Sequence, residues 1–220
     1  MSAQTTLLNN SDSLSGVMNE LKTLVGNGGV IAFPTDTFYG LGVDPRQERA
    51  IERVFQVKQR PADKPLLVLI SSLKQAEGLV KEIPSSAMKL IDRFWPGPLT
   101  LILPARDDLP RNLTAGTGKL GVRIPGNALT RQLLDGIACP LTAPSANTSG
   151  FPPPRSASEV EEQLGQQIDW ILDGGLTPGD KESSIVDLTR DLPTLLRAGA
   201  VPTDDLESTL GHSLTMISAQ

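Results

Sequence analysis

The chain has 220 residues, of which 39% are hydrophobic, so it is long enough to form one domain with a full hydrophobic core. Its net charge of −5 excludes a general electrostatic attraction to nucleic acid, and its single histidine and single cysteine exclude a histidine-based triad, a multi-histidine metal site and an intrachain disulfide. The polar N-terminus lacks a signal-peptide pattern, and no apolar run reaches the roughly 20 residues of a membrane span, so we expect a soluble cytoplasmic protein with no membrane partner.

Helices and strands are expected to alternate along the chain. Helical spacing of apolar residues predicts helices over 17–25, 51–60, 129–134 and 158–164, and two short helices within 73–95. Short apolar runs predict strands at 30–33, 66–70, 99–103 and 120–124, and three late strands at 170–172, 184–188 and 194–197. This order predicts an α/β fold, with a mixed sheet because the late strands follow one another closely.

The end of the chain has a different pattern. From about residue 200 the apolar periodicity is lost, and residues 201–220 are expected to form a loose C-terminal tail. His212 lies in this stretch and is expected to be solvated.

The segment 34–42 follows the first predicted strand and is rich in polar side chains and glycine. It supplies the hydroxyls of Thr35 and Thr37, the carboxylate of Asp36, and two glycines that permit close backbone approach. Ligands of open α/β sheets bind at such strand ends. Two interpretations stay open, a ligand-binding loop or an ordinary turn whose threonines and aspartate cap a helix.

Three cations, Lys58, Arg60 and Lys64, lie close together where a predicted helix ends. Ammonium and guanidinium groups together suit a polyphosphate. The alternative is that they compensate the negative end of the helix dipole. Pro61 and Pro65 make the loop rigid, which a solvated run of charges does not need.

The segment 140–154 is dense in hydroxyl and amide groups, including those of Ser145 and Asn147, and is bounded by prolines. It suits the phosphates and sugar of a nucleotide, with an ordinary surface loop as the alternative. Ser183 and Arg197 border the late strands and are either site residues or surface residues of a hairpin.

Arg123 interrupts the apolar strand 120–124. A charged residue in such a strand is seldom buried without a partner, and a guanidinium can bind a carboxylate through two hydrogen bonds. Alternation along the strand places the Arg123 side chain opposite those of Val122 and Ile124, so it can face a polar cavity while they face the core. The chain has no Walker sequence and no GxGxxG. The residues by themselves therefore predict a cationic, hydroxyl-rich pocket for an anionic ligand.

At these same segments the chain resembles the YrdC/TsaC family of threonylcarbamoyl-adenylate synthases. The matching strings, in the family's order over about residues 13–200, are PTDTFYGLG, KQRPADKPL, FWPGPLTLILPA, GVRIP, PSANTSG and ESSIVDLT. The resemblance implies one catalytic domain over 13–200, built as a twisted mixed α/β sheet with flanking helices around a large concave cavity. It also implies that L-threonine, bicarbonate and ATP, accompanied by Mg²⁺, give threonylcarbamoyl-adenylate and pyrophosphate.

The resemblance also implies a role for particular residues. Lys58 and Arg60 match the family's cationic catalytic pair that holds the ATP phosphates. The further residues that match the nucleotide side are Lys64, Ser145, Asn147 and Arg197, with Lys119 at a position whose residue often differs. The residues that match the amino-acid side are Thr37, Arg123 and Ser183, of which Arg123 would take the threonine carboxylate. The chain departs from some relatives at Leu69, where they have histidine, and at Ala143, where they have threonine.

The implied partner is a separate complex that transfers the threonylcarbamoyl group to adenosine next to the anticodon of tRNA, with weak direct tRNA contact. The chain resembles the short, stand-alone form. One alternative is an RNA-binding module of the same fold, which the low aromatic content of 4% and the net charge disfavour. Another is a paralogue that uses a different carbamoyl donor or acceptor; such proteins usually carry zinc-finger cysteines, and this chain has one cysteine.

Overall fold

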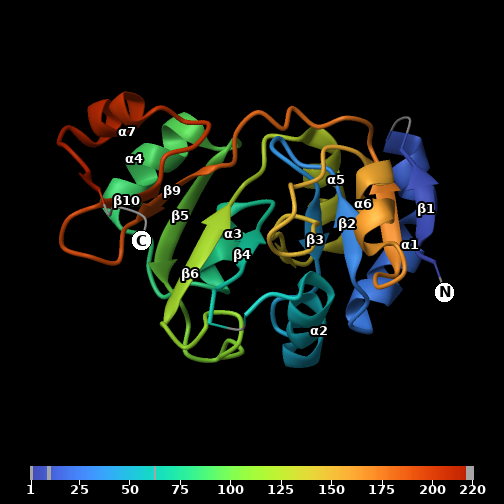
Figure 1. Cartoon of the computed structure of the whole chain (residues 1–220). Helices are drawn as coiled ribbons and strands as arrows, with labels where there is room; N and C mark the ends of the chain where they lie inside the picture. Colours follow the sequence, from blue (N-terminus) through green and yellow to red (C-terminus); the bar gives the residue numbers. More distant parts are fainter. Residues whose placement is uncertain (1, 9–10, 62, 217–220) are drawn as a thin grey trace.

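The computed structural model describes residues 2–8, 11–61 and 63–216. It contains two β-sheets side by side, each covered by helices (Figure 1). The smaller sheet has the strand order β1-β8-β2-β3, in which β2 pairs in parallel with β8 and antiparallel with β3. The bounds of its strands are β1 (Gln4–Leu7), β2 (Ile31–Phe33), β3 (Gly40–Gly42) and β8 (Trp170–Asp173).

The larger sheet has the order β11-β10-β9-β5-β6-β4-β7 and is also mixed, because β5 runs parallel to β9 and antiparallel to β6. The bounds of its strands are β4 (Leu67–Leu69), β5 (Leu99–Pro104), β6 (Lys119–Arg123), β7 (Leu141–Thr142), β9 (Ser184–Asp187), β10 (Thr194–Arg197) and β11 (Thr215–Met216). The α/β class and the mixed pairing predicted from the sequence are confirmed, although the strands are divided between two sheets.

The helices lie where the sequence predicts helices, apart from the last, which was not predicted. Their bounds are α1 (Ser11–Gly26), α2 (Glu48–Lys58), α3 (Leu73–Glu77), α4 (Ser85–Phe94), α5 (Ala128–Ile137), α6 (Ala157–Leu164) and α7 (Thr203–Leu210). The end of α2 matters for the site. Gln59 adopts a left-handed conformation with φ of 50°, and its N–H donates to Gln56 and Phe55 carbonyls, which ends the helix.

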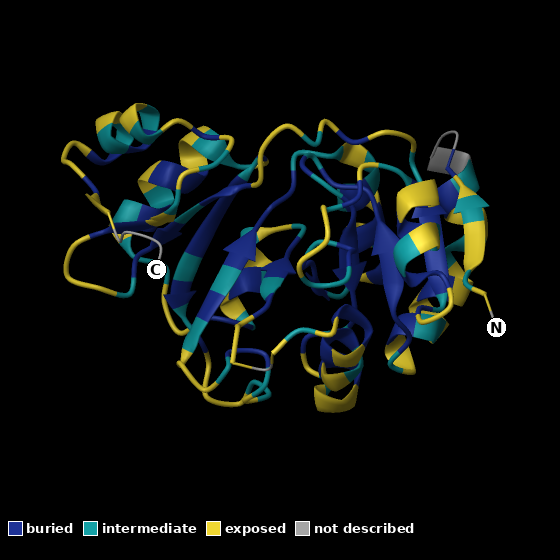
Figure 2. Ribbon diagram, in the orientation of Figure 1, coloured by how far each residue is buried: buried dark blue, intermediate teal, exposed yellow. Residues whose placement is uncertain are grey.

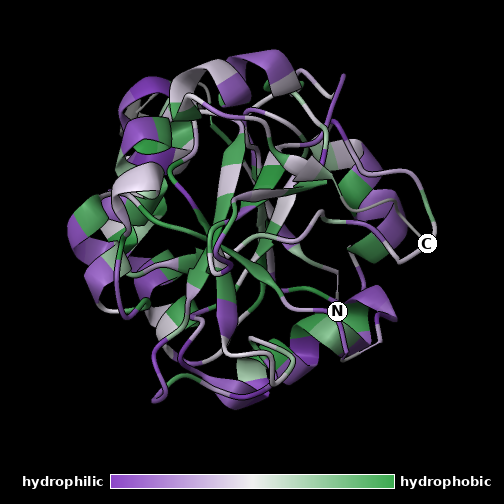
Figure 3. Ribbon diagram, turned by 90° about the vertical axis from the view of Figure 1, so that its left-hand side faces the viewer, coloured by the Kyte–Doolittle hydropathy of each residue, from purple (hydrophilic) through white to green (hydrophobic). Residues whose placement is uncertain are grey.

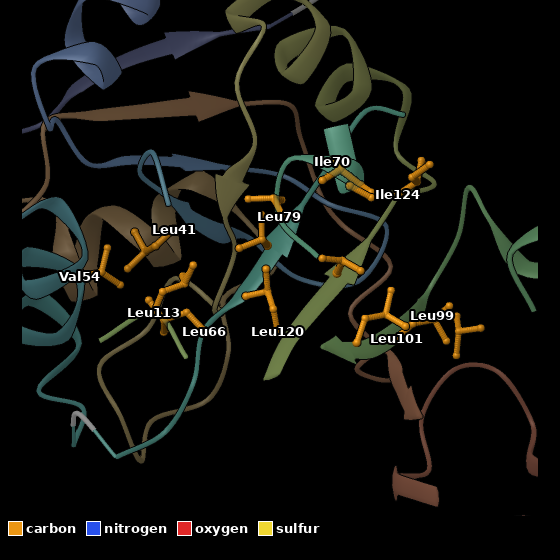
Figure 4. Close-up of a cluster of buried hydrophobic side chains, with 14 of the residues drawn as sticks. Leu41, Val54, Leu66, Ile70, Leu79, Leu99, Leu101, Leu113, Leu120 and Ile124 are labelled. Atoms are coloured by element: carbon orange, nitrogen blue, oxygen red, sulfur yellow. The ribbon is translucent and has the colours of Figure 1, made fainter. Parts of the chain in front are cut away.

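The hydrophobic core lies between the sheets and their helices, as the buried strands of Figure 2 show. Leu99, Leu101 and Leu120 belong to one cluster with Leu41 of the smaller sheet and Val54 of α2 (Figure 4). Because side chains alternate along a strand, the intervening residues of β5 and β6 face away from this cluster. That second face forms a wall of the site described below.

The expectation of a loose tail after residue 200 is wrong over residues 201–216. Residues Thr203–Leu210 form α7, which contacts α4, and Leu206 and Leu210 are buried there. In Figure 3 the outer helices carry both hydrophilic and hydrophobic bands, whereas hydrophobic and neutral colours predominate in the strands inside. The apolar pair Leu206 and Leu210, one helical turn apart, was the available signal. His212 is exposed, as expected; residues 217–220 lie outside the described part.

Among the described residues, no helix combines the length and apolar character that crossing a membrane requires.

Candidate active site

A cavity of about 220 Å³ opens between the loop that joins β2 to β3 and the strands of the larger sheet. Hydroxyl groups and cations share its lining with apolar side chains. The hydroxyl-bearing residues are Thr35, Thr37, Tyr39, Thr100, Ser145 and Ser183. The charged ones are Arg60, Arg123, Arg197 and Glu182. This composition suits a small polar anion that also carries an apolar part.

The floor of the cavity is the second face of β5 and β6. Thr100 and Ile102 of β5, and Gly121 and Arg123 of β6, line it, while their neighbours in sequence are buried in the core. The prediction that Arg123 faces the cavity, opposite Val122 and Ile124, is confirmed. Thr100 is a site residue that the sequence does not single out, because its neighbours in the strand are apolar.

Arg123 is neutralised by an acid of the β2–β3 loop. Its Nη2 lies 2.5 Å from Asp36 Oδ1, its Nε donates to the Gly97 carbonyl at 2.8 Å, and its Nη1 lies 3.5 Å from Thr37 Oγ1. The Arg123 side chain is only 3% exposed and that of Asp36 17%. A substrate carboxylate would thus have to share the guanidinium with Asp36. Nothing in the sequence around Arg123 indicated a partner within the protein, and Asp36 is that partner.

Arg197 of β10 is connected by polar contacts to Glu182 and Ser183, just before β9, and through Ser183 to β5. Its Nη1 donates to Glu182 Oε2 at 2.5 Å, and its Nε and Nη2 donate to the carbonyl and hydroxyl of Ser183 at 2.9 and 3.1 Å. The Ser183 hydroxyl is 2.9 Å from that of Thr100. Burial lowers the pKa of Arg197, and Arg123 acts in the same direction, whereas Glu182 opposes it. Ser183 and Arg197, predicted as separate site residues, thus form one connected group.

Arg60 is a cavity cation that contacts no acidic side chain among the described residues. Its Nη2 donates to the Pro65 carbonyl at 3.2 Å, and its Nε has no hydrogen-bond partner within the described residues. Burial lowers the pKa of Arg60, while Asp63 raises it. Lys64, predicted beside it, is exposed and does not line the cavity.

Lys58 is placed differently from the prediction. It is buried at the end of α2, is 2% exposed and does not line the cavity. Its ammonium donates to the carbonyls of Ser145 and Asn147 and to Asn147 Oδ1. Burial lowers the pKa of Lys58 to about 7, and the nearby Arg60 acts in the same direction. The structure therefore separates the predicted pair, with Arg60 in the cavity and Lys58 behind it.

Of the remaining predicted site residues, some line the cavity and others lie outside its lining. Thr37 and Ser145 line the cavity, as do the two apolar positions Leu69 and Ala143. Asn147 is buried behind Ser145 and accepts the Ser145 hydroxyl at 2.5 Å. Lys119 forms an ion pair with Asp187 at 3.0 Å and stays outside the lining.

Tyr39 ties the β2–β3 loop to the segment that connects the two sheets. Its buried hydroxyl donates to the Gly175 carbonyl at 2.8 Å and accepts from the Gly174 N–H at 3.2 Å. The same segment donates from Gly179 N to the Thr37 carbonyl at 2.8 Å. In Figure 1 it runs along the top of the molecule from β8 to β9. Tyr39 therefore helps to fix the approach of this segment to Ser183.

Replacing Tyr39 by phenylalanine should lower the free energy of unfolding by about 1 kcal/mol, because the Gly175 carbonyl loses its donor and the Gly174 N–H its acceptor. Burial, with Asp173 acting in the same direction, raises the pKa of Tyr39, so the phenol keeps the proton that it donates. Urea unfolding at pH 7 measures the change. A variant as stable as the parent would show that these two bonds contribute nothing.

Comparison with known proteins identifies the family of the chain. A family model described as telomere recombination, and named for Sua5, YciO and YrdC, matches residues 23–199. The chain is 45% identical over 188 residues to a threonylcarbamoyl-AMP synthase of Pyrococcus abyssi, a match covering 86% of this chain and 55% of that protein. A Bacillus subtilis protein of the same name is 40% identical over 183 residues, covering 83% of this chain and 53% of its own length.

The fold comparison points the same way. A crystal structure of P. abyssi Sua5 complexed with L-threonine matches with a TM-score of 0.90 at 38% identity, over 99% of this chain and 63% of that chain. The chain spans about half the length of the two curated relatives named above. Because the family model matches most of the chain and the folds agree, the chain belongs to the Sua5/YciO/YrdC family.

Proposed function

We propose that the chain is an enzyme, a threonylcarbamoyl-AMP synthase, which converts L-threonine, bicarbonate and ATP into threonylcarbamoyl-adenylate and pyrophosphate. The observation that carries the proposal is the likeness, over 99% of this chain, to a structure described as a complex with L-threonine. The cavity supports it, because arginines, hydroxyls and apolar side chains line one space. The product would go to a separate complex that modifies tRNA.

The reaction needs positioning and charge neutralisation more than a covalent protein nucleophile. The threonine amine attacks bicarbonate with loss of water, or carbon dioxide with loss of a proton, to give a carbamate. The carbamate oxygen then attacks the α-phosphorus of ATP, and pyrophosphate leaves. Negative charge develops on the phosphoryl oxygens, and fixed donors placed there lower the barrier. Arg60 is suited to this role, because its Nε has no partner among the described residues.

Magnesium would enter with ATP as part of the substrate. Glu182 is the acidic residue of the cavity lining, and it already pairs with Arg197. The phosphate oxygens of the nucleotide, hard ligands that Mg²⁺ prefers, would therefore hold most of the ion's coordination.

Purified protein incubated with ATP, Mg²⁺, bicarbonate and L-threonine should release pyrophosphate only when threonine and bicarbonate are both present. Pyrophosphate release is measured together with mass detection of the adenylate. The control omits one substrate at a time and replaces L-threonine with D-threonine. Release that continues unchanged without threonine would refute the proposed reaction.

A further inference from the structure

We propose that Lys58 is a positioning residue and not a phosphate ligand: its ammonium holds the turn Ser145–Asn147 against the end of α2, so that the Ser145 hydroxyl is fixed in the cavity. The proposal concerns the site of the proposed function, but its central measurement needs no substrate.

The first support is the count of donors and acceptors at the Lys58 ammonium. A lysine ammonium has three N–H donors and no acceptor. Among the described residues it donates to three oxygen atoms: the Ser145 carbonyl, the Asn147 carbonyl at 2.7 Å and Asn147 Oδ1 at 3.3 Å. These acceptors match the three donors, so a phosphate oxygen would have to displace one of them.

The second support is the direction of the side chain. Lys58 is the last residue of α2, and the left-handed Gln59 follows it before Arg60. Arg60 lines the cavity, whereas Lys58 is buried and does not. Because the backbone reverses at Gln59, the side chains of Lys58 and Arg60 point in different directions. Of the two, only Arg60 lines the cavity in which a ligand can bind.

The third support is that both the backbone carbonyl and the side-chain ammonium of Lys58 form hydrogen bonds with residues 145–149. The Lys58 carbonyl accepts the Ser149 N–H at 2.7 Å, while its ammonium holds the carbonyls of Ser145 and Asn147. A buried ammonium is costly without such compensation, and the buried carbonyls are costly without a donor. Asn147 Oδ1 also accepts the Ser145 hydroxyl at 2.5 Å, so the ammonium and the cavity hydroxyl share one acceptor.

The test compares two variants, Lys58→Met and Arg60→Met. Arg60→Met is the control, because it removes the neighbouring cation from the cavity and leaves the hydrogen bonds of the turn in place. We expect Lys58→Met to lower the melting temperature of the ligand-free protein by about 4 °C or more, because buried carbonyls lose their donor. Hydrogen exchange of the amides in 145–149 should become faster in this variant. Arg60→Met should leave exchange in the turn as in the parent.

Nucleotide titrations give the second readout. In Arg60→Met the loss of affinity should be about tenfold larger for Mg-ATP than for AMP, because a charge-assisted contact to the β- or γ-phosphate, which AMP lacks, is lost. In Lys58→Met the loss should be similar for both nucleotides. A parent protein that binds neither nucleotide would count against the proposed function, while melting and exchange would still decide the role of Lys58.

The proposal is overturned if Lys58→Met keeps the parent's melting temperature and exchange rates and loses affinity only for Mg-ATP. If Lys58→Met does not fold, Lys58→Gln is used, which keeps an N–H donor on a side chain one atom shorter. It should then melt below the parent with faster exchange in 145–149; unchanged melting and exchange would overturn the proposal equally.

Discussion

Replacing Asp36 by asparagine is expected to lower the free energy of unfolding of the ligand-free protein by about 3 kcal/mol, because one partner of a buried ion pair loses its charge. Asparagine keeps the shape of the side chain, so the change reports mainly on charge. The Arg123 guanidinium, 3% exposed, would keep the Gly97 carbonyl, the Thr37 hydroxyl and an amide oxygen as neutral contacts, but it would lose the negative charge that compensates its own. Urea unfolding at pH 7 without ligand measures the effect.

The matched control is an exposed ion pair in which the same Asp→Asn change is made. Lys81 and Asp107 lie 2.7 Å apart, with side chains 50% and 89% exposed. Asp107→Asn should leave the free energy of unfolding nearly unchanged, because water solvates the lysine that remains. If Asp36→Asn loses no more stability than Asp107→Asn, Asp36 does not compensate Arg123.

A double variant separates charge compensation from other effects of the substitution. Asp36→Asn combined with Arg123→Gln removes both charges, and it should be more stable than Asp36→Asn alone, because no uncompensated charge stays buried. L-threonine should also raise the melting temperature of Asp36→Asn more than that of the parent. Its carboxylate would supply the missing negative charge, if Arg123 receives it as the family resemblance implies.

The strands and helices with a clear apolar pattern were predictable, because burial on one face leaves a period in the sequence. The strands at β5 and β6 and the helix α2 are examples, and the alternation in β6 also gave the direction of Arg123. The strand β3 was missed because two of its three residues are glycines, whose place in a sheet is set by pairing with β2. Because glycine has no side chain, it adds nothing to the apolar alternation by which a strand is predicted.

The partners of the site residues were not predictable, because they come from distant parts of the chain. Nothing in the strand around Arg123 indicates that Asp36 will lie beside it. The run Lys58 to Lys64 suggested one cationic cluster, whereas the structure buries the first, places Arg60 in the cavity and exposes the last. One left-handed residue, Gln59, decides this separation, and glutamine rarely adopts that conformation.

Gly121 indicates where a side chain must be absent. It lies in β6 on the cavity floor, between Leu120 and Val122, which are both buried in the core. A Cβ atom built on Gly121 would lie 3.3 Å from Thr100 Cγ2, so even alanine requires a small shift of Thr100. Thr100 in turn contacts the Ser183 hydroxyl, which Arg197 holds. A larger side chain here would fill part of the cavity and displace these polar groups.

Gly121→Val is therefore expected to lower kcat/KM for threonine-dependent pyrophosphate release by about a hundredfold, since a displacement of about 1 Å at a reacting centre has an effect of that size. Gly121→Ala should lose less than about tenfold, because the required shift is a few tenths of an ångström. Steady-state kinetics with ATP and threonine varied separately should show a lower kcat/KM for both substrates. The reason is that Thr100, Ser183 and Arg197 are connected by hydrogen bonds, so they are displaced together.

Stability must be measured beside activity, and here the two should diverge. Valine is favoured over glycine in the interior of a strand, so urea unfolding of Gly121→Val should show no large loss. Gly16→Val is the control, since a Cβ atom at this exposed position of α1 meets nothing within 4 Å. Normal kinetics in Gly121→Val would mean that the floor of the cavity lies clear of both substrates, and a stable fold with lost activity would place the reaction above Gly121.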